Sequence, residues 1–138
     1  MCLGTIDKIT KYKVDEIGSG YRVVLVKRSI KTLFRKKYIT PFYKSPVKVN
    51  RKWIEDDAME MLWAGYSDDA YQTGFHITTN WGDAQKLLAG FREANQDSKF
   101  ALIEVIFKNT TATGEQAYIT GGVSVAVARS VKNLQEVK

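Results

Sequence analysis

The chain has 138 residues, the length of one globular domain, and its 44% hydrophobic and 26% charged residues exclude wholesale disorder. Its one cysteine, Cys2, excludes an intramolecular disulfide and a cysteine-rich zinc site, and His76 is the only histidine. The longest apolar runs fall far short of the roughly 20 residues that a membrane helix needs, and residues 1–7 lack the features of a signal peptide. We therefore expect a cytoplasmic protein that needs no metal or other cofactor.

The formal net charge of +6 is unevenly distributed along the chain. Residues 1–52 hold 14 Lys and Arg against 3 Asp and Glu and so carry +11, whereas residues 53–138 hold 7 against 12 and carry −5. A surface with this asymmetry attracts anions, such as a nucleic acid, a nucleotide or the acidic half of a second copy. An ordinary solvated surface with no such partner remains an alternative.

The first elements in the chain are expected to be strands. Residues 1–18 are polar and lightly patterned, which suggests an arm with a short strand. Gly18-Ser19-Gly20 indicates a turn, and the β-branched run at residues 21–27 predicts a buried strand.

The basic segment that follows is open to two interpretations. Residues 28–37 could form a turn or a short helix, and residues 38–43 look extended. Pro41 and Pro46 place this extended part at a sheet edge or in a loop, because proline cannot donate a hydrogen bond to a neighbouring strand.

Two segments predict helices. Apolar side chains recur on one helical face over residues 53–65, and residues 66–69 then form a loop. Over residues 83–95 they recur more regularly, and Asn80 is placed to cap that helix with Asp83 as a capping-box partner.

The rest of the chain predicts strands. Residues 99–107 are apolar on both faces except at Glu104, which is typical of a central strand, and residues 108–114 resemble a loop. Residues 116–120 and 123–129 predict a hairpin around Gly121-Gly122, and residues 130–138 a loosely held tail or a short closing strand. The order predicts a single α+β domain over residues 1–138, a mostly antiparallel sheet with one or two helices packed on it.

Evidence for catalysis is sparse. Removal of Met1 would free Cys2 as an N-terminal nucleophile, although an ordinary second residue is the simpler explanation. His76, Tyr118 and Glu115 supply the residue types of an ADP-ribose-transferring site, but nothing in the sequence places them together. No phosphate-binding glycine loop is present, and the acidic residues near position 56 suit a solvated face better than a metal site.

Evidence for binding is stronger. Cations and aromatic rings alternate at residues 35–38 and 42–44, a pattern that suits single-stranded RNA or a small nucleotide. The same pattern would arise if Tyr38 and Phe42 were core residues with lysines outside. Catalysis, nucleic-acid binding and nucleotide binding therefore all remain possible from the residues alone.

One block of residues resembles a known group. Gly74-Phe75-His76-Ile77-Thr78 follows Tyr71 and precedes a capped helix with Asp83-Ala84. Around it stand further short motifs: Gly20-Tyr21-Arg22, Tyr43-Lys44-Ser45-Pro46, Trp53 and Val127-Ala128-Arg129. Over roughly residues 20–129 the arrangement resembles small phage and bacterial proteins that include the phage Thoeris anti-defence proteins of the first type.

The resemblance implies a homo-oligomer that binds a cyclic ADP-ribose-type immune signal between subunits and holds it without cleaving it. In such a site Phe75 would stack on adenine, and His76 would support the loop or a ribose. Cations would meet the phosphates, and threonine hydroxyls would donate hydrogen bonds. The expected ligand-binding residues are Arg22, Lys44, Phe75, His76, Thr78, Thr120 and Arg129.

The leading hypothesis is thus a phage anti-defence protein that is not an enzyme and acts in the cytoplasm of the infected cell. The main alternative is a small basic nucleic-acid-binding phage protein. An enzyme acting on nucleotides or ADP-ribose is a third interpretation, with His76 as its first candidate catalytic residue.

Overall fold

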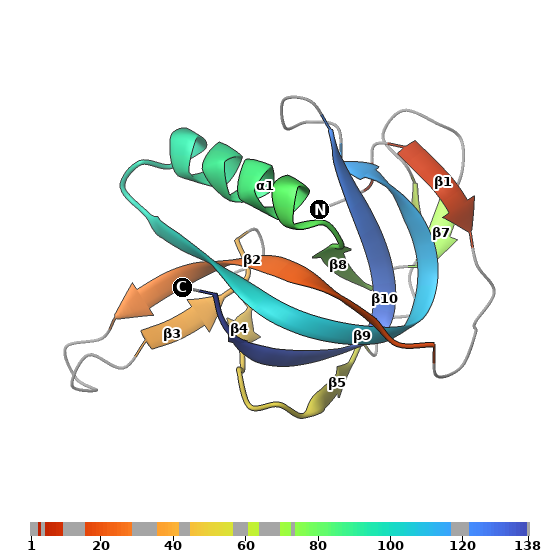
Figure 1. The fold of residues 1–138 in the computed structure, drawn as a ribbon, viewed down its shortest axis with the longest axis horizontal. Coiled ribbons are helices and arrows are strands. Elements are labelled where there is room, and N and C mark those ends of the chain that lie inside the picture. The colour runs from red at the N-terminus through yellow and green to blue at the C-terminus, as the bar shows by residue number, and fades with distance from the viewer. Residues whose placement is uncertain are drawn as a thin grey trace.

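Two long antiparallel strands, β9 (Lys99–Gln116) and β10 (Val123–Glu136), form the centre of the fold in the computed structural model (Figure 1). The structure describes residues 3, 5–9, 16–28, 36–41, 45–56, 61–63, 70–72, 74–116 and 122–137. The remaining elements are β1 (Thr5–Ile9), β2 (Gly18–Arg28), β3 (Lys36–Ile39), β4 (Pro46–Val47), β5 (Trp53–Glu55), β6 (Met61–Trp63), β7 (Ala70–Gln72), β8 (Phe75–Thr78) and α1 (Trp81–Ala94).

The strand pairings close on themselves. The main sheet has the order β1-β9-β10-β8-β2-β3-β4, with β5 also on β10, and β2 additionally pairs with β9. The ring β9–β10–β8–β2 is therefore complete, while β6 and β7 form a separate pair. These pairings are antiparallel and α1 packs on the sheet, which confirms the predicted α+β fold (Figure 1).

Bulges bend the two long strands. Ala112 lies opposite Val127 but Thr110 lies opposite Ala128, so β9 has one extra residue there, and Asn109 has a φ of 59°. A second register shift follows Asn133 in β10. An extra residue makes a strand bend and twist, and both strands curve strongly in Figure 1.

The bulged part of β9 corrects the predicted loop at residues 108–114. These polar residues are in a strand because β10 pairs with them on one side and β1 on the other. For residues 130–138 the sequence left two expectations, a loosely held tail or a short closing strand. These residues are no loose tail: Val131 and Asn133 are fully buried, and β10 continues to Glu136 as a closing strand.

Gly18-Ser19-Gly20 forms the start of β2, so the predicted turn is wrong. A Cβ atom at Gly18 would lie 2.4 Å from the Phe107 ring, and one at Gly20 would lie 2.6 Å from the Thr78 carbonyl oxygen. Both glycines therefore serve a close approach between strands, which is the other common reason for glycine in a strand.

The predicted helix at residues 53–65 is also wrong where the structure describes it. Trp53–Glu55 is β5 and Met61–Trp63 is β6, with residues 57–60 and 64–69 outside the described residues. Ile54 lies opposite Val131 in the pairing with β10. Pairing with a distant strand here outweighs a local helical pattern.

Other strand predictions are confirmed in part. β2 contains the predicted run at residues 21–27, a short strand occurs in the N-terminal arm, and Pro46 lies in the edge strand β4. β9 and β10 form the predicted hairpin, with Gln116 opposite Val123, but residues 117–121 lie outside the described residues. Within the basic segment the structure describes Lys36–Ile39 as β3 and leaves residues 29–35 undescribed.

Helix α1 confirms the predicted second helix and begins two residues before the expected start. The Asn80 side chain caps it by accepting a hydrogen bond from the Asp83 backbone N–H at 3.2 Å. The Asp83 carboxylate accepts one from the Ser124 N–H at 3.1 Å, which ties the helix to β10. Among the described residues, no helix has the length and apolar character to cross a membrane.

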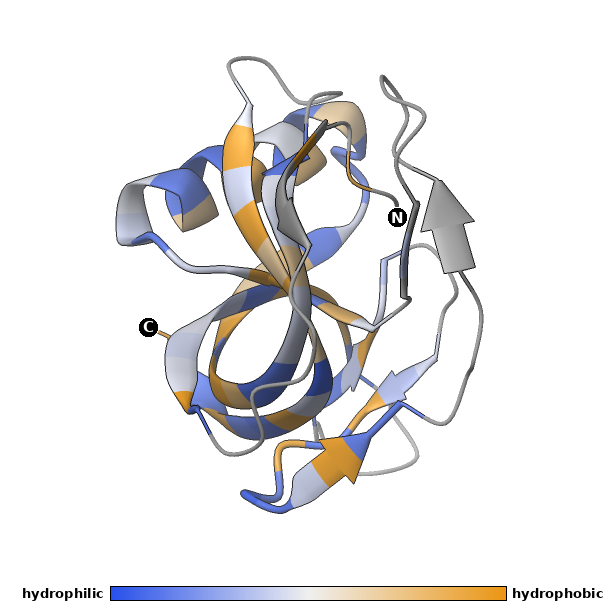
Figure 2. Cartoon of the chain, turned by 90° about the vertical axis from the view of Figure 1, so that its right-hand side faces the viewer, coloured by the Kyte–Doolittle hydropathy of each residue, from blue (hydrophilic) through white to orange (hydrophobic). Residues whose placement is uncertain are grey.

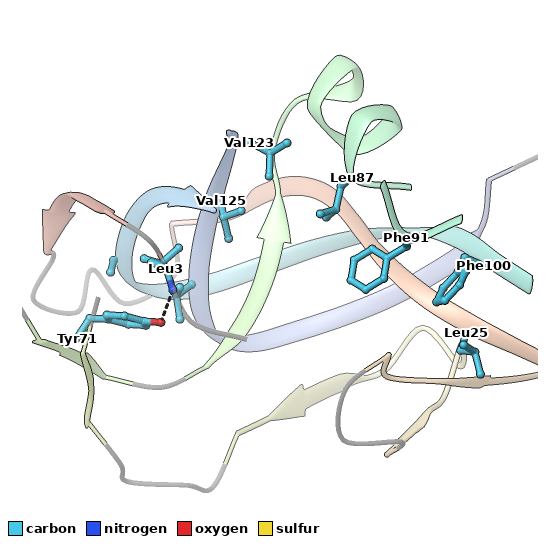
Figure 3. Close-up of a cluster of buried hydrophobic side chains, with 10 residues drawn as sticks. Leu3, Leu25, Tyr71, Leu87, Phe91, Phe100, Val123 and Val125 are labelled. Atoms are coloured by element: carbon cyan, nitrogen blue, oxygen red, sulfur yellow. Dashed lines mark hydrogen bonds between the residues drawn. The ribbon is translucent and has the colours of Figure 1, made fainter. Parts of the chain in front are cut away.

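Two apolar clusters cover the two faces of the sheet, because side chains alternate along each strand. The strands contain both hydrophobic and hydrophilic residues, as the colours of Figure 2 show. We name the cluster that includes residues of α1 the helix-side core, and the cluster that includes Val24, Ile77 and Ile103 the inner core. The helix-side core contains Leu87 and Phe91 of α1, and Figure 3 shows both pointing at the sheet. In β10, Val125 belongs to the helix-side core and Ala126 to the inner core.

Candidate functional site

The candidate site is a cavity of about 480 Å³ where β2 and β8 separate. These two strands share a single residue pair, Tyr21 with Thr78, and both residues line the cavity. Because this pairing is so short, β2 and β8 are not paired to each other beyond it, which leaves an opening in the sheet. We call this opening the β2–β8 seam.

The cavity wall includes residues from both faces of the sheet. Val23 packs against the helix-side core and Phe75 against the inner core, and both line the cavity. We define the helix-side half by Val23, Leu87, Phe91, Gln116 and Val125, and the inner half by Arg22, Thr40, Pro41, Ser45, Glu55, Asp56 and Phe75. The β2–β8 seam connects the two halves.

Arg22 is the main cation in this wall. Its guanidinium group lies 5.1 Å from the centre of the Phe75 ring and donates a hydrogen bond to Asn133 Oδ1 at 3.0 Å. Burial lowers its pKa to about 10, so the group remains charged at neutral pH. Within the described part of the chain, no carboxylate forms an ion pair with Arg22. Arg22 is partly buried, and a cation removed from water without a counterion is costly, a cost that a bound anion would offset.

Phe75 and Thr78 are both in β8 and both line the cavity. Phe75 is half-buried, and the Arg22 guanidinium lies over its ring. Thr78 is buried at the β2–β8 seam and lies opposite Val125 of β10. The structure thus brings an aromatic ring, a cation and a hydroxyl group to one cavity.

His76 faces the helix side and is held by hydrogen bonds. The Tyr71 hydroxyl lies 3.4 Å from its Nε2 atom, and the Leu3 backbone N–H donates to that hydroxyl at 2.9 Å (Figure 3). Burial lowers the pKa of His76 to about 4, and the positive charge of Arg22 acts in the same direction. A hydrogen bond with the backbone of Gly74 opposes this shift. The ring is therefore neutral at physiological pH and weakly basic.

Arg129 lies behind the wall and does not line the cavity. Its guanidinium group donates to the backbone carbonyl of Asp56 and lies 3.8 Å from the Asp56 carboxylate. Asp56 itself lines the cavity. Arg129 therefore positions part of the wall, whereas the sequence interpretation placed it at the phosphates.

Two of the expected binding residues, Lys44 and Thr120, lie outside the described residues, although Ser45 lines the cavity. Of the three residues considered for ADP-ribose transfer, only His76 is in the wall; Glu115 is an exposed residue of β9, and Tyr118 is not described. In the described ranges no three His, Cys, Asp or Glu side chains gather as metal ligands.

Gln116 was not among the binding residues expected from the sequence. It is fully buried, lines the helix-side half, and neither its Nε2 nor its Oε1 atom has a hydrogen-bond partner among the residues that the structure describes. Buried side-chain amides are nearly always hydrogen-bonded. A polar residue at the end of a predicted strand gave no sign of this environment.

Comparison with known protein families, curated proteins and solved structures finds no match to this chain. The fold and the cavity describe a small α+β protein with a partly apolar pocket whose wall contains a partly buried cation.

Proposed function

We propose that the protein binds a cyclic ADP-ribose-type nucleotide and sequesters it without cleaving it, as an anti-defence protein in the cytoplasm of an infected cell. The observation that carries the proposal is Arg22, a partly buried guanidinium without a carboxylate partner among the described residues, in the wall of a cavity of about 480 Å³. Small-molecule sites occupy about 300–1,000 Å³ and combine apolar walls with a few polar groups.

Arg22 gives the inner half a phosphate-binding group beside the carboxylates of Glu55 and Asp56, and the Asp56 carboxylate lies 3.8 Å from the Arg129 guanidinium. A guanidinium group binds phosphate oxygens through two parallel hydrogen bonds, and the Arg22 guanidinium already has its position fixed by Asn133 and Phe75. Thr78 supplies a hydroxyl group at the β2–β8 seam. Lys44, next in sequence to the wall residue Ser45, is our candidate for the second phosphate.

Binding without cleavage is supported by the state of His76. A general base works best when its pKa is near the operating pH, and burial holds the pKa of His76 at about 4. Its ring is also engaged with Tyr71. In this proposal His76 shapes the wall and removes no proton from the ligand.

We also propose that a second copy of the chain completes the site. Trp81 is 44% exposed at the start of α1, and its ring centre lies 5.1 Å from that of Tyr21, a cavity residue. An exposed aromatic surface beside a pocket is suited to contact with another subunit. The opposite charges of residues 1–52 and 53–138 would favour such pairing.

One observation favours nucleic-acid binding as a second candidate. Lys27 lies opposite Lys37 and Arg28 opposite Lys36 at the end of the β2–β3 hairpin, and these four side chains are exposed. Lys36 forms an ion pair with Glu136 at 3.0 Å. The like charges of the other three side chains repel each other, and a polyanion would relieve the repulsion. Nucleic-acid affinity would fall steeply with salt, whereas a ligand with two phosphates gives a shallow dependence.

The test is a capture-and-release assay with cyclic ADP-ribose isomers on wild type, Arg22→Met and the matched control Arg28→Met. After removal of free ligand, the protein is heat-denatured and the released compound is identified by mass spectrometry. We expect intact ligand from wild type and Arg28→Met, and affinity reduced about tenfold or more in Arg22→Met, because a charged hydrogen bond is lost.

Other outcomes contradict the proposal in different ways. A chemically altered product would indicate an enzyme, and substitution of His76 would be the next step. Failure of wild type to retain any isomer would reject these ligands, and salt-dependent retention of single-stranded RNA would then favour the second candidate.

A further inference from the structure

The Gln116 side-chain amide has no hydrogen-bond partner among the residues that the structure describes. It lines the helix-side half, lies opposite Val123 and has zero exposed surface. Neither amide atom is hydrogen-bonded in the described structure, although one can donate and the other can accept. An amide left unpaired beside a cavity is available to a ligand that presents a matching donor and acceptor.

The surroundings of this amide define the shape of that ligand. Leu87 and Phe91 of α1 face Val23 and Val125 of the sheet in the same half of the cavity. These four side chains are apolar, so they favour a flat hydrophobic group whose polar atoms lie at its edge, while His76 and Thr78 add polar atoms on the same face of the sheet. A purine base has this character, and adenine presents an adjacent donor and acceptor, N6–H and N7, to which a Gln amide can form two hydrogen bonds.

We infer that Gln116 recognises the adenine base in the helix-side half while Arg22 binds phosphate in the inner half. This inference rests on the proposed function and adds the position and identity of the base. Val23 and Arg22 are consecutive residues of β2, so their side chains lie on opposite faces of the sheet. In this arrangement the ligand extends from one half of the cavity to the other through the β2–β8 seam, beside the Tyr21–Thr78 pair.

This arrangement differs from the expected stacking of adenine on Phe75. The Arg22 guanidinium lies over the Phe75 ring, 5.1 Å from its centre, so that ring supports the phosphate-binding group. The base then stacks against side chains of the helix-side half, where Phe91 is the aromatic residue.

The experiment compares cyclic ADP-ribose with its hypoxanthine counterpart, cyclic inosine diphosphate ribose, by isothermal titration calorimetry. Hypoxanthine has an acceptor at position 6 in place of the donor, so it cannot satisfy the amide in the same way. The proteins are wild type, Gln116→Met and the control Gln135→Met, an exposed glutamine of β10. Gln116→Leu serves as a second variant if Gln116→Met proves unstable.

We expect wild type and Gln135→Met to bind the adenine form about tenfold or more tightly than the hypoxanthine form. Gln116→Met should lose this preference, chiefly through weaker binding of the adenine form. Its thermal midpoint should not fall, because the substitution removes a buried unpaired amide. Equal loss of affinity for both bases would be a packing effect and would contradict the inference.

The remaining outcomes separate the two proposals. If wild type binds both bases equally, or if Gln116→Met keeps the adenine preference, base recognition by Gln116 is rejected and sequestration stands. If wild type binds neither nucleotide, the proposed function fails and this inference fails with it.

Discussion

His76 is fixed in orientation and in protonation state by its contacts. Hydrogen bonds connect it through the Tyr71 hydroxyl to the backbone of Leu3, and Leu3 and Tyr71 are fully buried. Burial keeps the ring neutral, with a pKa of about 4. The neutral ring adds no charge near Arg22, and the other charged side chains that the structure describes in the wall are the carboxylates of Glu55 and Asp56.

The low pKa of His76 predicts acid sensitivity. The unfolded chain takes up a proton near pH 6.5 and the folded chain only near pH 4, so the free energy of unfolding falls as the pH drops between these values. Between pH 7 and pH 5 we expect a loss of up to about 2 kcal/mol. Urea unfolding at the two pH values measures it.

The control for acid sensitivity is His76→Gln, which retains a group that Tyr71 can contact but does not titrate. Since His76 is the only histidine, this variant should show little change between pH 7 and pH 5. A wild-type loss that persists in His76→Gln would assign the effect to other groups.

Single residues of the site differ in how well the sequence predicts them. Phe75, His76 and Thr78 share one short strand, so a local block contains the information that places them together. Arg129 was expected at a phosphate but contacts Asp56, because β5 pairs with β10, a contact between segments far apart in the chain. The Gln116 side-chain amide has no hydrogen-bond partner among the described residues, and this property follows from three-dimensional packing alone.

At the scale of elements, β2 contacts two other strands of the closed ring. It pairs with β9 over most of its length and touches β8 at one residue pair. Gly20 permits the second contact, because its Cα lies against the Thr78 backbone and the Ile77 side chain. The geometry of the β2–β8 seam therefore depends on a residue without a side chain.

Gly20→Ala should lower the free energy of unfolding by about 1–3 kcal/mol, because its new methyl group would overlap Thr78. The control is Ser19→Ala, an exposed position of the same strand, where we expect a change within about 0.5 kcal/mol. Both are measured by urea unfolding. Equal stability of the two variants would show that β2 and β8 adjust freely at this point.

Elements with strong local signals were predicted well, whereas some elements that depend on pairing with distant strands were not. Helix α1 has a regular apolar face and a capping residue, Asn80, both of which are local. The continuation of β9 through Asn109 and Thr111 has no such signal, because residues typical of loops are in a strand that pairs with β10, and β1 joins this strand from Ala112 onward. In the same way, pairing with β10 outweighed the local helical pattern, so that part of the expected helix at residues 53–65 forms β5.

At the scale of the molecule, the end of β10 joins three parts of the fold. It pairs with β5 and with β9, it buries Val131 and Asn133, and the Val137 N–H donates to the Leu102 carbonyl at 2.8 Å. The Asn133 side chain also contacts Arg22 and the Lys48 carbonyl.

Deletion of residues 130–138 should abolish cooperative folding, because it removes these buried contacts and exposes one edge of β9. We expect the deletion variant to lose dispersed amide signals in a proton NMR spectrum and its sigmoidal urea transition. Removal of Lys138 alone serves as the control and should leave both intact. A folded deletion variant would mean that β9, β8 and β2 suffice for the core.

The fold class was predictable, whereas the sheet order was not. Alternating apolar residues and one clear helix indicate α+β architecture. Closure of the ring requires Gly18 to lie opposite Phe107 and Leu25 opposite Phe100, and no local pattern marks these distant pairings.

That closure also determines when the protein can fold during its synthesis. β1 and β2 have β9 as a partner, so they must wait for a strand that leaves the ribosome 71 residues after the end of β2. At about 5–20 residues per second this delay is roughly 4–14 s. Throughout that time the apolar run of β2 lacks its main neighbour, and the adjacent Lys27 and Arg28 act as charged gatekeepers against association of nascent chains.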